Sequence, residues 1–356
     1  MLIVDAHQDL AFNALNYGRD YRVSVDTKRR SEAGTLVPET AGLVTLGLPD
    51  SLGAGVGVVF ATIFTAPKTN PLILSDKLTY TTPQQAYALG LAQWDYYQRL
   101  FETEPRLQAV AHAAELDAVL KTWQPGNEAA RKQGLVLLIE NADVILEPKQ
   151  FEEWYARGVR IVGPAWAGTR YCGGTGAPGP LTSLGVELLG VMADLGAILD
   201  LSHMAEQAYF QALDRYDGVV IASHSNPRQF VNSDRHLSDD MILRLAERDG
   251  VMGIVFYNRF LREGWTRASS HKRDVPLSTA VDAIDYVCQL TGSAAYVGIG
   301  TDFDGGFGAE SIPDGMDSIA DLPQIAHHLR ARGFSEADVA AVMGGNMLRC
   351  LRRALS

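Results

Sequence analysis

Eight short apolar runs rich in β-branched residues recur along the chain, and stretches with the apolar spacing of helices lie between them. Their near-continuous apolar character is typical of parallel strands that are covered on both faces. Alternating strands and helices, with eight strands in total, favour a (β/α)8 barrel of the TIM type over an open doubly wound sheet. The eight runs are 2–6, 56–64, 135–139, 159–163, 197–201, 219–222, 251–256 and 296–300, and the main helical stretches are 83–101, 113–122, 184–195, 205–215, 238–248 and 277–290.

Nothing in the 356 residues divides the chain, which has no internal repeat, no low-complexity segment and no linker rich in Pro, Gly or Ser. Barrels of this kind reach that length, so we expect residues 1–356 to form a single catalytic domain. The least regular segments, 19–48, 171–181 and 262–276, are polar or glycine-rich and follow strands. We expect them to shape the active-site face, because that face is built from segments that leave the strand ends.

The composition limits the partners that the protein can have. A formal net charge of -11 and a pI near 5.2 argue against general binding to nucleic acids or to anionic membranes. The sequence shows no basic and apolar leader and no run of about 18 apolar residues, so we expect a cytoplasmic protein without a membrane partner. Its three cysteines, Cys172, Cys288 and Cys350, are widely spaced and odd in number, which fits a reducing compartment better than a disulfide framework.

Side chains that bind metals or transfer protons follow five of the predicted strands. Any one of them has an ordinary explanation, such as a buried barrel histidine with one hydrogen bond. The six together predict an active site, because barrel enzymes carry their chemistry at the carboxyl ends of the strands. They are His7 and Asp9 after the first run, Glu140 after the third, His203 after the fifth, His224 after the sixth and Asp302 after the eighth.

This set of side chains indicates two metal ions. Three His, one Glu and one Asp exceed what one tetrahedral zinc ion needs, so we expect two Zn2+ ions with Glu140 as the bridge. Two cations a few ångströms apart lower the pKa of a shared water and polarise a carbonyl, which provides a hydroxide nucleophile near neutral pH. Asp302 is then expected to carry a proton from that water to the departing nitrogen. The predicted reaction is therefore a hydrolysis.

Longer motifs surround these residues and occur in a specific order along nearly the whole chain. They are DAHQD at 5–9, DLSH at 200–203, SHS at 223–225, RHLSDD at 235–240, FYN at 256–258, GTDFDG at 300–305, and the closing stretch that includes 312–316 and 345–349. In these motifs the chain resembles the renal or membrane dipeptidase family, metal-dependent peptidases of the amidohydrolase superfamily. The resemblance implies a binuclear zinc barrel that hydrolyses dipeptides.

The resemblance also implies how the ligands are divided between the two ions. His7 and Asp9 would hold one ion, His203 and His224 would hold the other, and Glu140 would bridge them. Asp302 would be the acid/base group and would also touch the free amine of the substrate.

The resemblance assigns two further residues to the substrate. Arg235 would bind the terminal carboxylate, and a guanidinium suits that role because it can donate two parallel hydrogen bonds to a carboxylate. An ion pair with Asp239 or Asp240 at the start of the following helix is the alternative for Arg235. Tyr257 resembles a substrate-facing tyrosine, and its alternative is a packed ring with a satisfied hydroxyl.

One position departs from the family pattern. The family has a His after the fourth strand that helps to hold the scissile carbonyl, and this chain has Trp166 at about that place. An indole donates one hydrogen bond but carries no proton at neutral pH, and losing one such donor lowers a rate by about two to three powers of ten. Arg170, Tyr171 or His236 could replace the missing donor.

We therefore expect a zinc-dependent dipeptidase whose substrate is a small dipeptide. The sequence is compatible with a homodimer. A second amidohydrolase reaction, the removal of an acyl group from an N-acyl amino acid, fits Arg235 equally well because both substrates carry a free carboxylate. The two differ in whether they need a free α-amine. A third alternative, from a different class, is a metal-binding or scaffold protein in which Trp166 has weakened catalysis.

Overall fold

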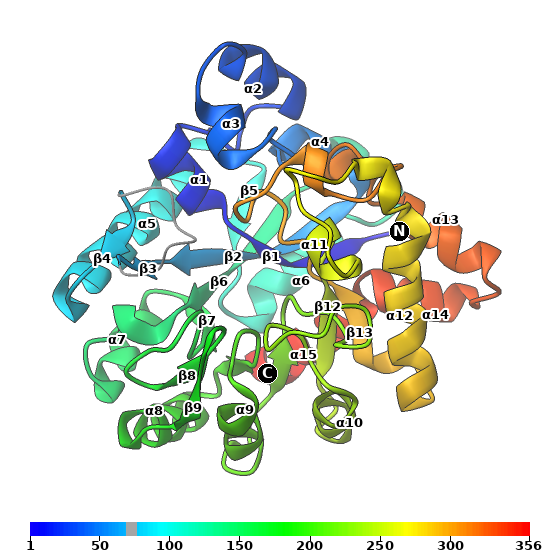
Figure 1. The fold of residues 1–356 in the computed structure, drawn as a ribbon. Coiled ribbons are helices and arrows are strands. Elements are labelled where there is room, and N and C mark those ends of the chain that lie inside the picture. Colours follow the sequence, from blue (N-terminus) through cyan, green and yellow to red (C-terminus); the bar gives the residue numbers. More distant parts are fainter. Residues whose placement is uncertain (69–76) are drawn as a thin grey trace.

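The computed structural model describes residues 1–68 and 77–356, and its centre is a closed barrel of parallel strands (Figure 1). The order around the barrel is β1-β2-β6-β7-β10-β11-β12-β13, and β13 pairs with β1 to close it. The predicted (β/α)8 fold is thus confirmed. The barrel strands are β1 (Ile3–Gln8), β2 (Val56–Phe64), β6 (Gln133–Glu140), β7 (Val159–Gly163), β10 (Ile198–Asp200), β11 (Val220–Ala222), β12 (Val251–Ile254) and β13 (Val297–Ile299).

Helices surround the barrel in Figure 1, and the six helical stretches expected from the sequence correspond to α5, α6, α8, α9, α10 and α12. Helix α5 begins where Thr82 accepts a hydrogen bond from the backbone N–H of Gln85 in a capping box. No described helix is long and apolar enough to cross a membrane. The surrounding helices are α1 (Leu10–Tyr17), α5 (Pro83–Thr103), α6 (Ala113–Lys121), α7 (Phe151–Ala156), α8 (Ser183–Leu195), α9 (Glu206–Leu213), α10 (Asp239–Glu247), α11 (Asn258–Leu261), α12 (Leu277–Thr291), α13 (Gln324–Ala331), α14 (Glu336–Ala340) and α15 (Asn346–Leu355).

Alternate strand residues form an apolar cluster inside the barrel. Phe60 and Leu138 belong to this cluster, and two residues further along the same strands Thr62 and Glu140 reach the candidate site, since residues i and i+2 of a strand share a face. Helices α6 and α15 contribute to the same cluster and overlap the centre of the barrel in Figure 1. Gly344, just before α15, approaches the backbone of Val4 near the start of β1. These helices therefore cover the amino-terminal end of the barrel and leave the carboxyl-terminal end for the site.

The segments that were expected to be irregular carry small elements. Segment 19–48 contains α2 (Val25–Glu32) and α3 (Val37–Ala41) and leads into α4 (Leu48–Ala54), while 171–181 forms an antiparallel hairpin of β8 (Cys172–Gly174) and β9 (Ala177–Leu181). Two short additions are β3 (Ala66–Pro67) paired with β4 (Thr79–Tyr80), and β5 (Leu107–Ala109) paired with the first residues of β6. The hairpin matters for the site, because its turn lies beside His203.

Candidate active site

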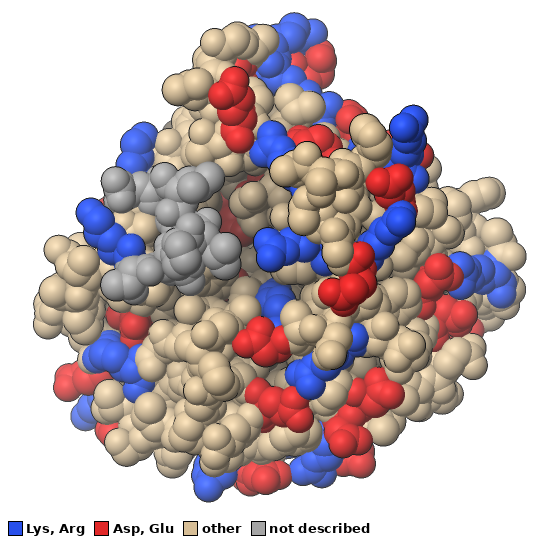
Figure 2. Space-filling model, viewed as in Figure 1, with Lys and Arg blue, Asp and Glu red and all other residues tan. Residues whose placement is uncertain are grey.

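A cavity of about 630 Å³ opens at the carboxyl ends of the barrel strands. The view in Figure 2 shows this face hollowed near its middle, with acidic atoms in the depth of the hollow and basic side chains beside it. His7 is fully buried and does not line the cavity itself. The predicted site residues that do line it are Asp9, Glu140, Trp166, His203, His224, Arg235, Tyr257 and Asp302.

Glu140, the last residue of β6, lies between three imidazoles. Its Oε2 is 3.3 Å from His7 Nε2, and its Oε1 is 3.3 Å from both His203 Nε2 and His224 Nε2. The two latter nitrogens lie 3.0 Å apart. The four side chains therefore converge, as the sequence predicted, with the carboxylate in the middle.

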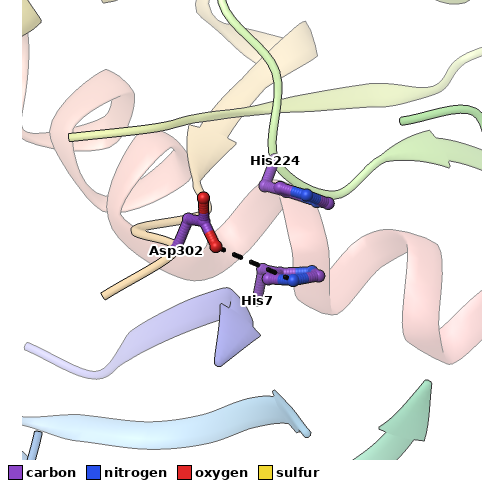
Figure 3. A group of neighbouring side chains, drawn as sticks. All are labelled: His7, His224 and Asp302. Atoms are coloured by element: carbon purple, nitrogen blue, oxygen red, sulfur yellow. Dashed lines mark ion pairs between the residues drawn. The ribbon is translucent and has the colours of Figure 1, made fainter. Parts of the chain in front are cut away.

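The two aspartates of the set approach from the side of His7. His7 Nε2 is 3.9 Å from Asp9 Oδ2 and 3.9 Å from Asp302 Oδ1. Figure 3 shows the His7 and His224 rings stacked on one another, 3.5 Å between centroids, with Asp302 beside them. All six residues proposed for metal binding and proton transfer are thus within reach of one centre.

Hydrogen bonds to the far side of two rings orient them toward Glu140. The Ser223 hydroxyl donates to Asp200 and lies 2.8 Å from His224 Nδ1, so its oxygen accepts a hydrogen bond from the N–H of that nitrogen. His203 Nδ1 lies 3.0 Å from Thr175 Oγ1 at the turn of the β8–β9 hairpin. Partners of this kind fix the ring and leave Nε2 as the free lone pair, as in many metal-binding histidines.

Two buried carboxylates hold the strand ends that carry these rings. Asp5 accepts from the backbone N–H of Thr301 at 2.8 Å and from its hydroxyl at 2.6 Å, which joins β1 to the end of β13. Asp200 accepts from the backbone N–H of Ser223 at 2.8 Å, which joins β10 to β11. The positions of His7, His224 and Asp302 therefore depend on carboxylates that do not enter the cavity.

Backbone strain is concentrated at the site. His203 and Asp302 have φ values of 66° and 57°, a left-handed conformation that costs a non-glycine residue roughly 1–3 kcal/mol. Gly305 makes the turn after Asp302 feasible, because a Cβ at that position would lie 2.0 Å from Asp302 Oδ1. The GTDFDG motif thus combines a strained carboxylate with the glycine that makes room for it.

The charges of the cluster are unbalanced. Burial disfavours the charged form of His7, but Glu140, Asp9 and Asp302 outweigh it and raise the pKa of His7 to about 10. Burial, with Glu140 adding to it, raises the pKa of Asp9 to about 6 and raises the pKa of Asp302 well above its usual range. A bound cation would favour the charged form of these buried carboxylates.

Arg235 lies on the cavity wall without a carboxylate partner in the described part of the chain. Its Nη2 donates to the backbone oxygen of His224 at 2.7 Å, its guanidinium lies 5.4 Å from the centre of the Phe260 ring, and its buried Nε has no hydrogen-bond partner there. Asp239 instead accepts from the Tyr286 hydroxyl at 2.7 Å. The alternative of an ion pair with the following helix is therefore not what the structure shows for Arg235.

Tyr257, after β12, and Trp166, after β7, both border the cavity. Tyr257 stacks on Phe307, with ring centroids 4.2 Å apart, so it is both a packed ring and a cavity-lining one. Trp166 contacts Phe64 edge-on at 5.1 Å and lies 6.0 Å from the His203 ring.

The three residues proposed to replace the family's histidine differ in position. Arg170 forms an ion pair of 3.3 Å with Asp143, and the Tyr171 hydroxyl donates to the backbone of Ile145, so neither lines the cavity. His236 does line it, and both of its ring nitrogens lack a hydrogen-bond partner among the described residues. Burial, together with Arg235, lowers the pKa of His236 to about 3, so this ring is neutral at physiological pH.

Sequence reasoning missed four residues that support the site: Thr175, which lines the cavity, and Ser223, Asp5 and Asp200, which do not. The last three lie within the quoted motifs, so their place one to three residues from a candidate ligand was the available signal. Thr175 lies in a glycine-rich segment with no such signal.

Three comparisons place the chain among known proteins. The family model described as membrane dipeptidase, peptidase family M19, matches residues 1–355. An uncharacterised protein in the pqqA 5' region of Klebsiella pneumoniae is 33% identical over 215 residues, which cover 58% of this chain and 76% of that protein. Mouse dipeptidase 3 is 28% identical over 284 residues, and the match spans 77% of this chain but only 53% of dipeptidase 3.

Solved structures share the fold along the whole chain. The dipeptidase AC of family M19 has a TM-score of 0.80 at 23% identity, with 100% of this chain and 99% of that chain covered. A metallopeptidase from Rhodobacter sphaeroides, bound to a phosphinate mimic of the dipeptide L-Ala-D-Ala, has a TM-score of 0.79 at 21% identity and 99% coverage of both chains. The chain belongs to the membrane dipeptidase family, peptidase family M19, and its enzyme class is that of the metal-dependent dipeptidases.

Proposed function

We propose that this protein hydrolyses dipeptides at a site that holds two zinc ions around Glu140. The observation that carries the proposal is the convergence of three imidazole Nε2 atoms on the two oxygens of one buried carboxylate. Arg235 lines the same cavity and has no carboxylate partner among the described residues, so its guanidinium is suited to a free carboxylate.

The side chains fit two cations. His203 and His224 direct Nε2 atoms at one another and at Glu140, an arrangement of lone pairs that is repulsive unless a cation or a proton lies between them. The buried Nε2 of His7 has no hydrogen-bond partner among the described residues. Ligand atoms of His7, Asp9 and Glu140 lie within 4.8 Å of one another, as do those of Glu140, His203 and His224, so Glu140 is the shared ligand.

Two zinc ions bound there supply an activated water near neutral pH and polarise the scissile carbonyl. Asp302 is the proton carrier of the proposed mechanism. Its Oδ1 lies beside the cluster, 3.9 Å from His7 Nε2, and burial raises its pKa, which suits a carboxyl group that accepts a proton and then gives it to the departing amine. A carboxylate at that place can also bind the free α-amine of a dipeptide.

The substrate is held at its carboxyl end by Arg235, and Tyr257 lines the cavity on the same side of the barrel. The metallopeptidase from Rhodobacter sphaeroides binds a mimic of a dipeptide, which supports a dipeptide as the substrate here. A second candidate, deacylation of N-acyl amino acids, is favoured by the aromatic side chains Phe12, Phe64 and Trp166 that line the cavity, because they suit an apolar acyl chain.

The test is hydrolysis of a dipeptide panel, with L- and D-residues at the second position, by the zinc-loaded protein, its chelated form and an Asp302→Asn variant. Each dipeptide is paired with its N-acetylated form and with an N-acyl amino acid. Glu187→Gln is the matched control, because Glu187 is exposed on α8, far from the cavity in sequence and structure.

We expect turnover that needs both zinc and Asp302, that is unchanged in the control and that requires a free α-amine. Metal analysis should give two zinc ions per chain. Turnover of blocked substrates alone would select the deacylase reaction, and binding of two ions without turnover of any amide would contradict the enzymatic role.

A further inference from the structure

The cavity has an aromatic side and a cationic side. Phe12 follows β1, Phe64 ends β2 and Trp166 follows β7, whereas Arg235 follows β11. In the closed ring of strands, β2 and β11 are separated by four steps in either direction, so they lie opposite each other. Arg235 stays near its own strand, because it donates to the backbone of His224. The cationic group therefore faces Phe64 across the cluster around Glu140. Trp166, whose strand β7 is two steps from β11, lies between these two sides, 6.0 Å from the His203 ring and 5.1 Å from Phe64.

Three rings form what we call the aromatic wall: Phe12, Phe64 and Trp166. Phe64 lies 5.4 Å from Phe12 and 5.1 Å from Trp166, both edge-on, and all three rings line the cavity. Phe12 and Phe64 are held from behind by a small apolar cluster that includes Ala66 and Leu78. The only polar atom of the wall is the indole nitrogen of Trp166, which has no hydrogen-bond partner in the described part of the chain.

A dipeptide held at Arg235 extends toward the aromatic residues. Two extended residues span about 7 Å. With the terminal carboxylate on Arg235 and the scissile bond at the cluster around Glu140, the first residue of the substrate extends away from Arg235. Its side chain then reaches the part of the cavity that the aromatic wall borders.

We propose that the aromatic wall binds an apolar side chain on the amino-terminal residue of the substrate, and that Trp166 is the residue that sets this preference. The proposal rests on the proposed dipeptidase function and adds its substrate class. An apolar side chain loses unfavourable contact with water at the wall, whereas a polar side chain of equal size loses its hydration and finds at most one partner. The position where the family pattern has a polar histidine thus becomes a recognition surface.

The test compares two pairs of dipeptides that differ between the isosteric residues Leu and Asn. Leu-Ala and Asn-Ala vary the residue that faces the wall, and Ala-Leu and Ala-Asn vary the residue on the Arg235 side. In the zinc-loaded protein we expect kcat/KM for Leu-Ala to exceed that for Asn-Ala by roughly tenfold or more. In Trp166→Gln this ratio should fall to about threefold or less, whereas the ratio of the second pair should stay unchanged; Trp166→Phe should retain most of the preference.

Equal kcat/KM values for Leu-Ala and Asn-Ala in the parent protein would overturn the proposal, and so would a Trp166→Gln variant that changes both ratios alike. If no dipeptide is turned over, the proposed function fails, and the apolar preference of the aromatic wall is then tested by binding alone. Calorimetric titration of the zinc-loaded protein with phosphinate mimics of Leu-Ala and Asn-Ala then decides: tighter binding of the Leu mimic, lost in Trp166→Gln, supports the wall, and equal binding refutes it.

Discussion

Thr175 offers a test of the metal site that leaves every proposed ligand in place. Its hydroxyl lies 3.0 Å from His203 Nδ1, and this is its only side-chain hydrogen bond among the described residues. Thr175→Val keeps the shape of the side chain and removes the oxygen. The backbone N–H of Thr175 still donates to Trp166 O at 3.3 Å, so the hairpin turn keeps its own contact.

The size of the effect follows from the hydrogen bond that is lost. One hydrogen bond contributes about 0.5–1.5 kcal/mol, or roughly two- to twelvefold in an equilibrium constant, and removing an outer partner of a metal-bound histidine lowers affinity by about 10–100-fold. The two ranges meet near tenfold. We therefore expect Thr175→Val to lower the affinity for one zinc ion, the one held by His203 and His224, by about tenfold. The affinity for the other ion should change by less than about twofold.

The assay is competition for zinc against a chelator of known affinity. The titration curve should show two binding steps, one for each ion. Thr175→Ser is the matched variant, since it restores the oxygen and should restore the affinity. Two unchanged steps in Thr175→Val would refute the inference that Thr175 orients His203, and a loss of both steps together would refute the division of ligands between two ions.

Two further predictions concern the substrate and the stability. Arg235→Lys should raise KM for dipeptides by about 10–100-fold, with a smaller change in kcat, because a charge-assisted hydrogen bond contributes about 1.5–3 kcal/mol; dipeptide amides, which lack the carboxylate, serve as controls, and an equal effect on acids and amides would contradict the role. Lys28 is 5% exposed, and burial lowers its pKa from 10.5 to about 8, so the folded chain binds fewer protons than the unfolded chain between these values and stability rises with pH across that window. Lys28→Met should therefore raise the free energy of unfolding at pH 7 by roughly 2–3 kcal/mol, and this gain should shrink as the pH rises from 8 to 10.5. Denaturant unfolding at several pH values measures the gain. A gain that is independent of pH would refute its assignment to the lowered pKa of Lys28.

The barrel was predictable because its strands lie in nearly continuous apolar runs that recur between helical stretches. Val56–Phe64 and Val159–Gly163 match the sequence prediction to the residue, and the remaining barrel strands differ only at their ends. Short elements were harder to predict. Helix α7 has only 6 residues, too few turns for a periodic pattern, and the β8–β9 hairpin lies in a glycine-rich segment where neither helical nor strand spacing is visible.

The same reasoning explains which parts of the site the sequence reveals. His7, Glu140 and His224 could be grouped because parallel strands bring their carboxyl ends together, so position along a strand is enough to predict proximity. The contacts of Thr175 and Trp166 depend instead on how loops fold over that face. Thr175 reaches His203 only because β8 and β9 pair, and Trp166 reaches Phe64 only because the loop after β7 turns toward β2. The strands thus determine where the chemistry lies, whereas the loops orient the ligands and choose the substrate, and these are the features that the Thr175 and Trp166 variants test.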